Sequence, residues 1–435
     1  MKLDRIYFIN LFFLFSIITS FFIGFIFKEY APGGAAGDFN FITWPLLEAF
    51  KNDFISTIKN YGTFNDGSYP LFYLFNAYIN PFSSSKSQYL LSNTFISFIT
   101  FIFFAILIKK NSTKTPLINC YFLSSIILLL PFYRSSAYWG TTENLGWMFF
   151  VLSLIFFSKI KLLHEEHNKK NYLDIVAFCI FSSCALYIRP ALVFLPLIYM
   201  LYLFILNKNI KTIFASIIFY IILSIPALIL FIIWDGFFDT KNIHPKILEA
   251  HSYKYIVRNI PILLSYFAFY LSPFLLIEFK EIGLKKFISK YVISFSIFFV
   301  LLVIFWKLNY FNYLTNLDYG GGAILKLNLL IKENNLFLML VSSAVGFSII
   351  YNLLKENFKF NICILLPIFI IYGFPKGLFQ EYLEPLILFL LFSGILQTKL
   401  KEIFFKNIYV SYITVTVYFS FYLVAATYYD LILRG

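Results

Sequence analysis

Residues 31–81 read APGGAAGDFNFITWPLLEAFKNDFISTIKNYGTFNDGSYPLFYLFNAYINP. This stretch follows the first apolar run directly, and it holds too many glycines and charges to cross a membrane. Within it large apolar residues recur every four positions, at Leu46, Phe50, Phe54 and Ile58. That spacing predicts an amphipathic helix lying on an apolar surface, with Pro45 in its first turn. We therefore expect residues 28–87 to form a large loop that carries interfacial helices.

The rest of the chain is far more apolar than a soluble protein. Hydrophobic residues make up 60% of the sequence and charged residues 13%, whereas a soluble domain carries about a quarter charged residues. Runs near the length of a membrane span recur from end to end. The expected spans cover residues 6–27, 88–108, 117–133, 143–158, 172–188, 190–206, 212–234, 256–277, 289–306, 335–354, 361–374, 383–397 and 408–429. The sequence thus predicts an all-α polytopic membrane protein of about 13 transmembrane helices, forming one domain over residues 1–435 without a separate soluble domain.

The distribution of charge predicts the orientation. With the N-terminus inside, the inner segments hold 20 of the 35 Lys and Arg residues but only 8 of the 22 acids. This agrees with the positive-inside rule and places the C-terminus and the 28–87 loop outside. The net charge of +13 is then a signal of topology, so no nucleic-acid partner is expected.

Asp38 is the candidate catalytic residue. It follows Gly33, Gly34 and Gly37, and small residues let a substrate approach the backbone closely. A carboxylate just above an apolar membrane edge loses hydration, which raises its pKa toward that of a useful base. A solvated loop acid is the alternative. The second acid of the loop, Asp66, is a substrate-binding candidate, but it also lies in a typical turn.

A dense polar segment joins the third and fourth expected spans. It runs from Tyr133 to Asn144 and brackets aromatic and hydroxyl side chains between Arg134 and Glu143. These two residues are candidates for binding a sugar or a lipid headgroup. The alternative is an interfacial aromatic belt in which Glu143 opens the next helix.

Single cations stand at three outer helix ends, at Arg189, Arg258 and Lys376. Each could bind phosphate, and each could instead reach for lipid headgroups. Near the twelfth span, Gln380 and Tyr382 are further substrate-binding candidates. No cofactor is indicated, and no metal site is predicted, although the loop with His244 and His251 leaves a divalent metal open.

Several of these features occur in the order found in one enzyme superfamily. They are an early Asp38, a Pro-Leu-Phe-Tyr segment at Pro70–Tyr73, the Arg134…Glu143 segment, the Arg189-Pro190 corner, and Gln-Glu-Tyr-Leu-Glu-Pro at Gln380–Pro385. In these features the chain resembles the GT-C superfamily, the integral-membrane glycosyltransferases that use polyprenyl-phosphate-linked sugars. It departs from the family pattern where Phe39 replaces an expected acid, where Tyr69 replaces a first proline, and where Gln380-Glu381 replaces an arginine.

The resemblance implies a transferase that moves a sugar from a polyprenyl-phosphate donor to a lipid-linked or cell-envelope glycan acceptor, with inversion. Asp38 would be the general base, and Arg189, Arg258 or Lys376 would bind the donor phosphate. The Phe-, Lys- and Asn-rich composition suggests a bacterium, so we expect the inner membrane, membrane lipids as neighbours, and an active site facing the periplasm. An O-antigen-type polymerase or ligase, or a non-enzymatic lipid-linked glycan flippase or transporter, is the alternative.

Overall fold

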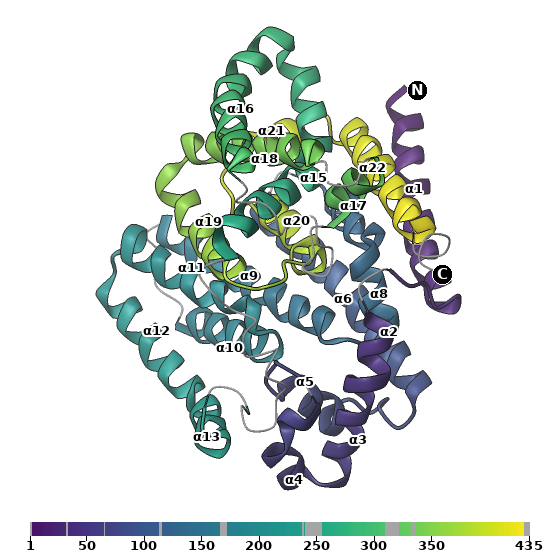
Figure 1. Ribbon diagram of the computed structural model, residues 1–435, viewed down its shortest axis with the longest axis vertical. Coiled ribbons are helices and arrows are strands. Elements are labelled where there is room, and N and C mark those ends of the chain that lie inside the picture. Colours follow the sequence, from purple (N-terminus) through teal and green to yellow (C-terminus); the bar gives the residue numbers. More distant parts are fainter. Residues whose placement is uncertain are drawn as a thin grey trace. The chain divides into compact units, whose positions relative to one another are not determined.

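The computed structural model describes residues 2–31, 34–64, 66–112, 115–165, 172–236, 239, 255–308, 322–331 and 336–429 (Figure 1). Within these ranges the chain is helical and forms no β-strand. The backbone divides into two compact units. One comprises Met1–Phe13 and Ala250–Phe421, and the other Leu14–Glu249 and Tyr422–Gly435. We call them the C-terminal unit and the N-terminal unit. The single domain expected over residues 1–435 stays a prediction.

The N-terminal unit contains most of α1 and the helices up to α13. In chain order these elements are α1 (Lys2–Ile26), α2 (Ala35–Asp38), η1 (Phe39–Thr43), α3 (Trp44–Asn52), α4 (Phe54–Lys59), η2 (Tyr61–Phe64), α5 (Leu71–Leu74), η3 (Phe75–Ile79), α6 (Lys86–Asn111), α7 (Leu117–Ser125), η4 (Ile126–Leu129), α8 (Pro131–Trp139), α9 (Thr142–Glu165), α10 (Tyr172–Ile188), η5 (Pro190–Val193), α11 (Phe194–Tyr202), η6 (Leu203–Asn207), α12 (Ile210–Leu223) and α13 (Ile225–Trp234). Seven of them, from α2 to η3, lie in the 28–87 segment.

The C-terminal unit is built around α15. Its elements are α15 (Ile256–Ile282), α16 (Leu284–Lys307), α17 (Gly322–Ile331), α18 (Phe337–Glu356), α19 (Phe358–Gly373), η9 (Gln380–Tyr382), α20 (Glu384–Phe392), α21 (Lys399–Lys406) and most of α22 (Ile408–Tyr428). Helix α18 packs along both α15 and α16. Pro273 leaves the Phe269 carbonyl without its helical donor, and the Tyr418 hydroxyl donates to that carbonyl at 2.9 Å.

The described residues contain eight helices long and apolar enough to cross a membrane, or nine if one bent pair is a single span. Two of the eight, Ile210–Trp234 and α16, bury only a small share of their side chains. A strongly apolar helix that the protein does not cover requires lipid around it. These are the properties of an integral membrane protein. Three of the remaining expected spans coincide with shorter apolar helices and one with the nine-residue α20, so the count of about 13 stays a prediction.

The orientation can be tested by cysteine labelling. A membrane-impermeant reagent should label Ser84→Cys from outside intact cells, whereas Lys285→Cys should react only after the cells are opened, because lysine-rich loops stay inside. Both positions are exposed, while Cys120, Cys179 and Cys363 are buried and Cys184 is half-buried, so background labelling should be low. External labelling of Lys285→Cys would reverse the proposed orientation.

The amphipathic helix predicted over residues 46–58 is two helices. The chain is extended at Asp53, with φ −152° and ψ 102°, and the Asp53 carboxylate accepts a hydrogen bond from the Ser56 amide at 3.0 Å. This N-cap starts α4 afresh, because an Asp side chain competes well for a free helical amide. Leu46, Phe50 and Ile58 are buried in a cluster with residues of α5, α6 and α13, whereas Phe54 is exposed. The expected apolar face therefore packs mainly on the protein itself.

The turn predicted between the third and fourth spans is largely helical. The pair Leu117–Leu129 and Pro131–Trp139 bends by 75°, and the bend falls at Leu130, which has ψ 120°. Proline disfavours helical geometry in the residue before it, so Pro131 breaks the span and starts α8. The true turn is shorter, at Gly140 and Thr141, where Gly140 has φ 61°.

Candidate functional site

Asp38 ends the short helix α2. The helix starts after Gly34, whose φ of 85° is readily adopted only by glycine and whose N–H donates to the Tyr30 hydroxyl at 3.0 Å. The Asp38 N–H in turn donates to the Gly34 carbonyl at 2.9 Å. A Cβ added at Gly37 would meet no described atom within 4 Å, so the space beside Asp38 is open. The Asp38 side chain is itself exposed and can be reached by a substrate.

The electrostatic environment makes Asp38 a stronger base than a free aspartate. Loss of hydration is the main cause that raises its pKa to about 6, and the negative charges of Glu143 and then Asp66 add to this rise. The carboxylate is crowded by protein on one side while it stays open on the other, which reconciles its exposure with its desolvation. A raised Asp38 pKa agrees with the expectation from the sequence.

Asp66 is held by local hydrogen bonds. Its carboxylate accepts from the hydroxyls of Tyr61 and Tyr73 and from both the amide and the hydroxyl of Ser68. Burial and then the Asp66 charge raise the pKa of both tyrosines well above the usual value, so they remain donors. The Ser68 amide bond is the turn interaction that the sequence indicated. These local donors occupy the Asp66 carboxylate, so it is less available to a substrate than Asp38 is.

Residues 139–143, which comprise the short turn between α8 and α9 and the helix ends beside it, carry buried polar atoms without a described partner. They are Nε1 of Trp139, Oγ1 of Thr141 and an oxygen, Oε2, of Glu143. Buried polar atoms are nearly always paired in folded proteins, so these three atoms are available to hydrogen-bond a bound molecule. The turn lies beside Asp38, because the Trp139 ring is 6.5 Å from the ring of Phe39 and Glu143 acts on the Asp38 charge.

Arg134 has a different role from the predicted one. Its guanidinium binds Glu29 through Nε at 2.8 Å and Nη2 at 2.6 Å, and it also donates to the carbonyls of Ser20 and Leu128. Only 2% of the Arg134 side chain is exposed. Breaking a buried pair of this kind is strongly destabilising, so Arg134 ties α8 to the end of α1 and its donors are occupied.

Arg189 lies in the same unit as Asp38. It precedes η5, is 5% exposed, and places its guanidinium 5.4 Å from the centre of the Trp147 ring. A Cβ added at Gly146 would lie 3.4 Å from the Arg189 Cβ. Glu143, Gly146 and Trp147 are spaced by three and four residues along α9, so they share one face of that helix. Arg189 therefore packs against the face that also carries Glu143.

The other candidates belong to the C-terminal unit. Arg258 is 5% exposed and donates to the carbonyls of Pro375 and Lys376, so it holds the loop that carries Lys376. Lys376 itself is half-buried. The structure thus brings together Asp38, Asp66, Glu143 and Arg189 in one unit and leaves Arg258, Lys376, Gln380 and Tyr382 in the other.

No protein-family model matches this chain, and no curated protein matches it.

Gln380 belongs to a buried network in the C-terminal unit. Its amide donates to the Tyr270 hydroxyl at 2.6 Å, and that hydroxyl donates to the Glu384 carboxylate at 3.0 Å. Its amide oxygen accepts from the Ala323 N–H at 2.7 Å, at the start of α17. The Tyr382 carbonyl accepts from the Tyr372 hydroxyl at 3.1 Å.

Sequence reasoning did not single out Glu29 or Glu384 as key polar groups, and it included Trp139 and Thr141 only as members of the 133–144 segment. Glu29 and Arg134 are 105 residues apart, and no local pattern pairs them. The only indication in the sequence was that Glu29 is an acid directly after the first apolar run. Among the described residues no three His, Cys, Asp or Glu side chains could together hold a metal ion, and His244 and His251 lie outside those residues.

Proposed function

We propose that this protein is a membrane glycosyltransferase that uses a polyprenyl-phosphate-linked sugar and acts at the outer face of a bacterial inner membrane. The observation that carries the proposal is the placement of Asp38 beside the turn of Trp139, Thr141 and Glu143. An accessible carboxylate with a raised pKa supplies a base, and the neighbouring unpartnered N–H, hydroxyl and carboxylate suit the hydroxyl groups of a sugar.

The proposed reaction is a single displacement. The acceptor hydroxyl oxygen bonds to the anomeric carbon as the bond from that carbon to the phosphate oxygen breaks. The hydroxyl proton passes to the Asp38 carboxylate, and the polyprenyl phosphate leaves with the bonding electrons, which inverts the anomeric centre. The leaving group is an anion and benefits from a cation more than from an acid. Arg189 is the candidate within the same unit, on the face of α9 that carries Glu143.

The proposal is tested by direct assay. The purified protein in lipid nanodiscs is incubated with radiolabelled polyprenyl-phosphate sugars and with lipids extracted from the source membranes as acceptors. Transfer of label into a new lipid-linked or glycan product that depends on intact Asp38 would support the proposal. Failure of a panel of hexose, pentose and amino-sugar donors, with folded protein and a working positive-control transferase, would contradict it.

The pH dependence of transfer provides a further prediction. Below about pH 6 the Asp38 carboxyl is protonated and cannot accept a proton, so kcat/KM should fall about tenfold per pH unit there and level off above it. Of the two neighbouring carboxylates, Glu143 raises the Asp38 pKa more, so Glu143→Gln should move the midpoint to lower pH further than Asp66→Asn does. Rate profiles of the three proteins between pH 4.5 and about 8 would measure this. A midpoint that neither substitution moves would exclude Asp38 as the titrating base.

A further inference from the structure

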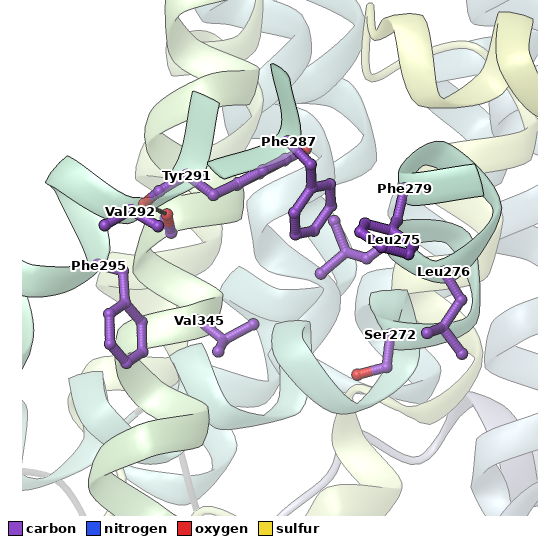
Figure 2. Close-up of a pocket in the computed structure, with 10 residues that line it drawn as sticks. Ser272, Leu275, Leu276, Phe279, Phe287, Tyr291, Val292, Phe295 and Val345 are labelled. Atoms are coloured by element: carbon purple, nitrogen blue, oxygen red, sulfur yellow. Dashed lines mark hydrogen bonds between the residues drawn. The ribbon is translucent and has the colours of Figure 1, made fainter. Parts of the chain in front are cut away.

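A cavity of about 500 Å³ lies in the C-terminal unit between α15, α16 and α18 (Figure 2). Helices α15 and α16 supply most of its walls, and α18 contributes Val345 and Ser348. Its volume falls within the range of about 300–1,000 Å³ typical of small-ligand sites. It belongs to neither the Asp38 turn nor the Gln380 network.

The cavity follows from how the three helices pack. A Cβ on Gly346 of α18 would collide with the Leu264 backbone, so α15 lies unusually close to α18 there. Ser294 of α16 and Ser348 of α18 are joined by a 2.8 Å hydrogen bond between their hydroxyls. By contrast, α15 and α16 make few direct contacts with each other, although only the turn at Gly283 separates them. The two helices thus diverge over α18 and leave a wedge between them.

The lining is suited to hydrocarbon. Each hydroxyl on it is satisfied within the protein: Ser272 donates to the Ala268 carbonyl at 2.6 Å, Ser348 to the Tyr291 carbonyl at 2.7 Å, and Tyr291 to the Glu278 carboxylate. The cavity therefore offers no free hydroxyl donor to a polar solute or to water. The remaining lining side chains are aliphatic or aromatic, and Leu276 and Val292 are 59% and 44% exposed. On membrane helices such side chains face acyl chains.

One end of the cavity lies next to a group of cations. Phe279 and Phe287 meet there edge to face, with ring centres 5.4 Å apart. Lys280 and Lys286 are their sequence neighbours, and Lys285 follows the same Gly283 turn. All three lysines are exposed.

The acids at this end are engaged by other lysines. Lys290 lies 2.7 Å from Glu278 and 3.2 Å from Glu356, and Lys406 pairs with Glu281. The Gly283 turn therefore presents a net positive charge beside an apolar cavity. A lysine-rich turn between two membrane helices faces the cytoplasm by the positive-inside rule, and the cytoplasmic leaflet carries anionic lipids.

We propose that this cavity binds one anionic phospholipid of the inner leaflet, with an acyl chain between α15 and α16 and the phosphate against Lys280, Lys285 and Lys286. The proposed transfer reaction uses none of the residues of this site. The polyprenyl-phosphate donor shares the chemistry of an anionic headgroup on a hydrocarbon chain, and the test below distinguishes the two.

The test uses the full-length protein reconstituted with equal amounts of phosphatidylglycerol and phosphatidylcholine and examined by native mass spectrometry. We expect one phosphatidylglycerol to be retained in preference to phosphatidylcholine. Substituting the three lysines with glutamine should lower that preference about fivefold for each charge removed. The matched control, Lys208→Gln with Lys211→Gln, removes exposed inner-face lysines of the N-terminal unit and should leave the preference unchanged.

Filling the cavity tests the acyl-chain part of the site. Val345→Phe and Leu276→Phe each place a larger side chain in the cavity, from α18 and from α15 respectively. Each should abolish retention of the bound lipid. Leu276 is more than half exposed, so its variant should fold even if Val345→Phe does not. Equal retention of the two lipids, or an equal loss of preference in the control, would overturn the proposal. Displacement of phosphatidylglycerol by a lower concentration of undecaprenyl phosphate would overturn it in favour of a donor site.

Discussion

Asp38→Asn should reduce sugar transfer by about 10²–10⁴-fold while leaving the protein folded and inserted in the membrane. The substitution keeps the size of the side chain and most of its hydrogen bonding but removes its basicity. Asp38 is exposed, and its backbone N–H, which the substitution leaves in place, donates to the Gly34 carbonyl. The loss should therefore be in chemistry rather than in stability. The measurement is kcat/KM with a fixed donor, together with the thermal unfolding of both proteins in the same detergent.

Asp66→Asn and Glu143→Gln serve as controls for this assignment. Asp66 is anchored by Tyr61, Tyr73 and Ser68, so its substitution should be milder for chemistry and should lower stability more than Asp38→Asn does. Glu143→Gln should weaken acceptor binding and lower the midpoint of the pH profile. If Asp38→Asn retains near-normal transfer while one of the two control substitutions abolishes it, Asp38 is not the base. The base is then the acid, Asp66 or Glu143, whose substitution abolished transfer.

Arg189→Ala should lower the efficiency of donor use by about one to two orders of magnitude. Losing one charge-assisted contact to phosphate costs about 1.5–3 kcal/mol, which corresponds to that range. The loss should appear with the donor rather than with the acceptor as the varied substrate. Because Arg189 is buried over Trp147, thermal unfolding must be measured alongside the kinetics.

Two further variants separate binding from packing at Arg189. Arg189→Lys keeps the charge but not the planar fork of donors, so it should fall between the wild type and Arg189→Ala. Arg258→Ala removes a buried arginine that holds the loop at Pro375 and Lys376, so it should lower the unfolding temperature. Unchanged kinetics in well-expressed Arg189→Ala would remove this residue from the site.

The sequence by itself determined that the protein is an all-α integral membrane protein, and it indicated Asp38 as the candidate base. Apolar runs long enough to span a bilayer, with lysines on one side, are a local property of the chain, because a helix in lipid satisfies its own backbone hydrogen bonds. Eight of the expected spans coincide with long apolar helices for this reason. The position of Asp38 after glycines could likewise be read from the sequence. Its raised pKa results mainly from loss of hydration, which the sequence indicated, and then from the charges of Glu143 and Asp66, whose proximity only the structure shows.

Only the tertiary structure decided which polar groups meet. The pairing of Arg134 with Glu29 joins residues 105 positions apart, and it turned a predicted substrate-binding residue into a buried structural one. The helix breaks at Asp53 and Leu130 have local causes, which are N-capping by Asp53 and the geometry imposed by Pro131. The regular spacing of apolar residues did not reveal them. The approach of Asp38 to Trp139, Thr141 and Glu143 depends on how α8 folds back after its 75° bend. Such encounters follow from long-range packing, which periodicity along the chain does not encode.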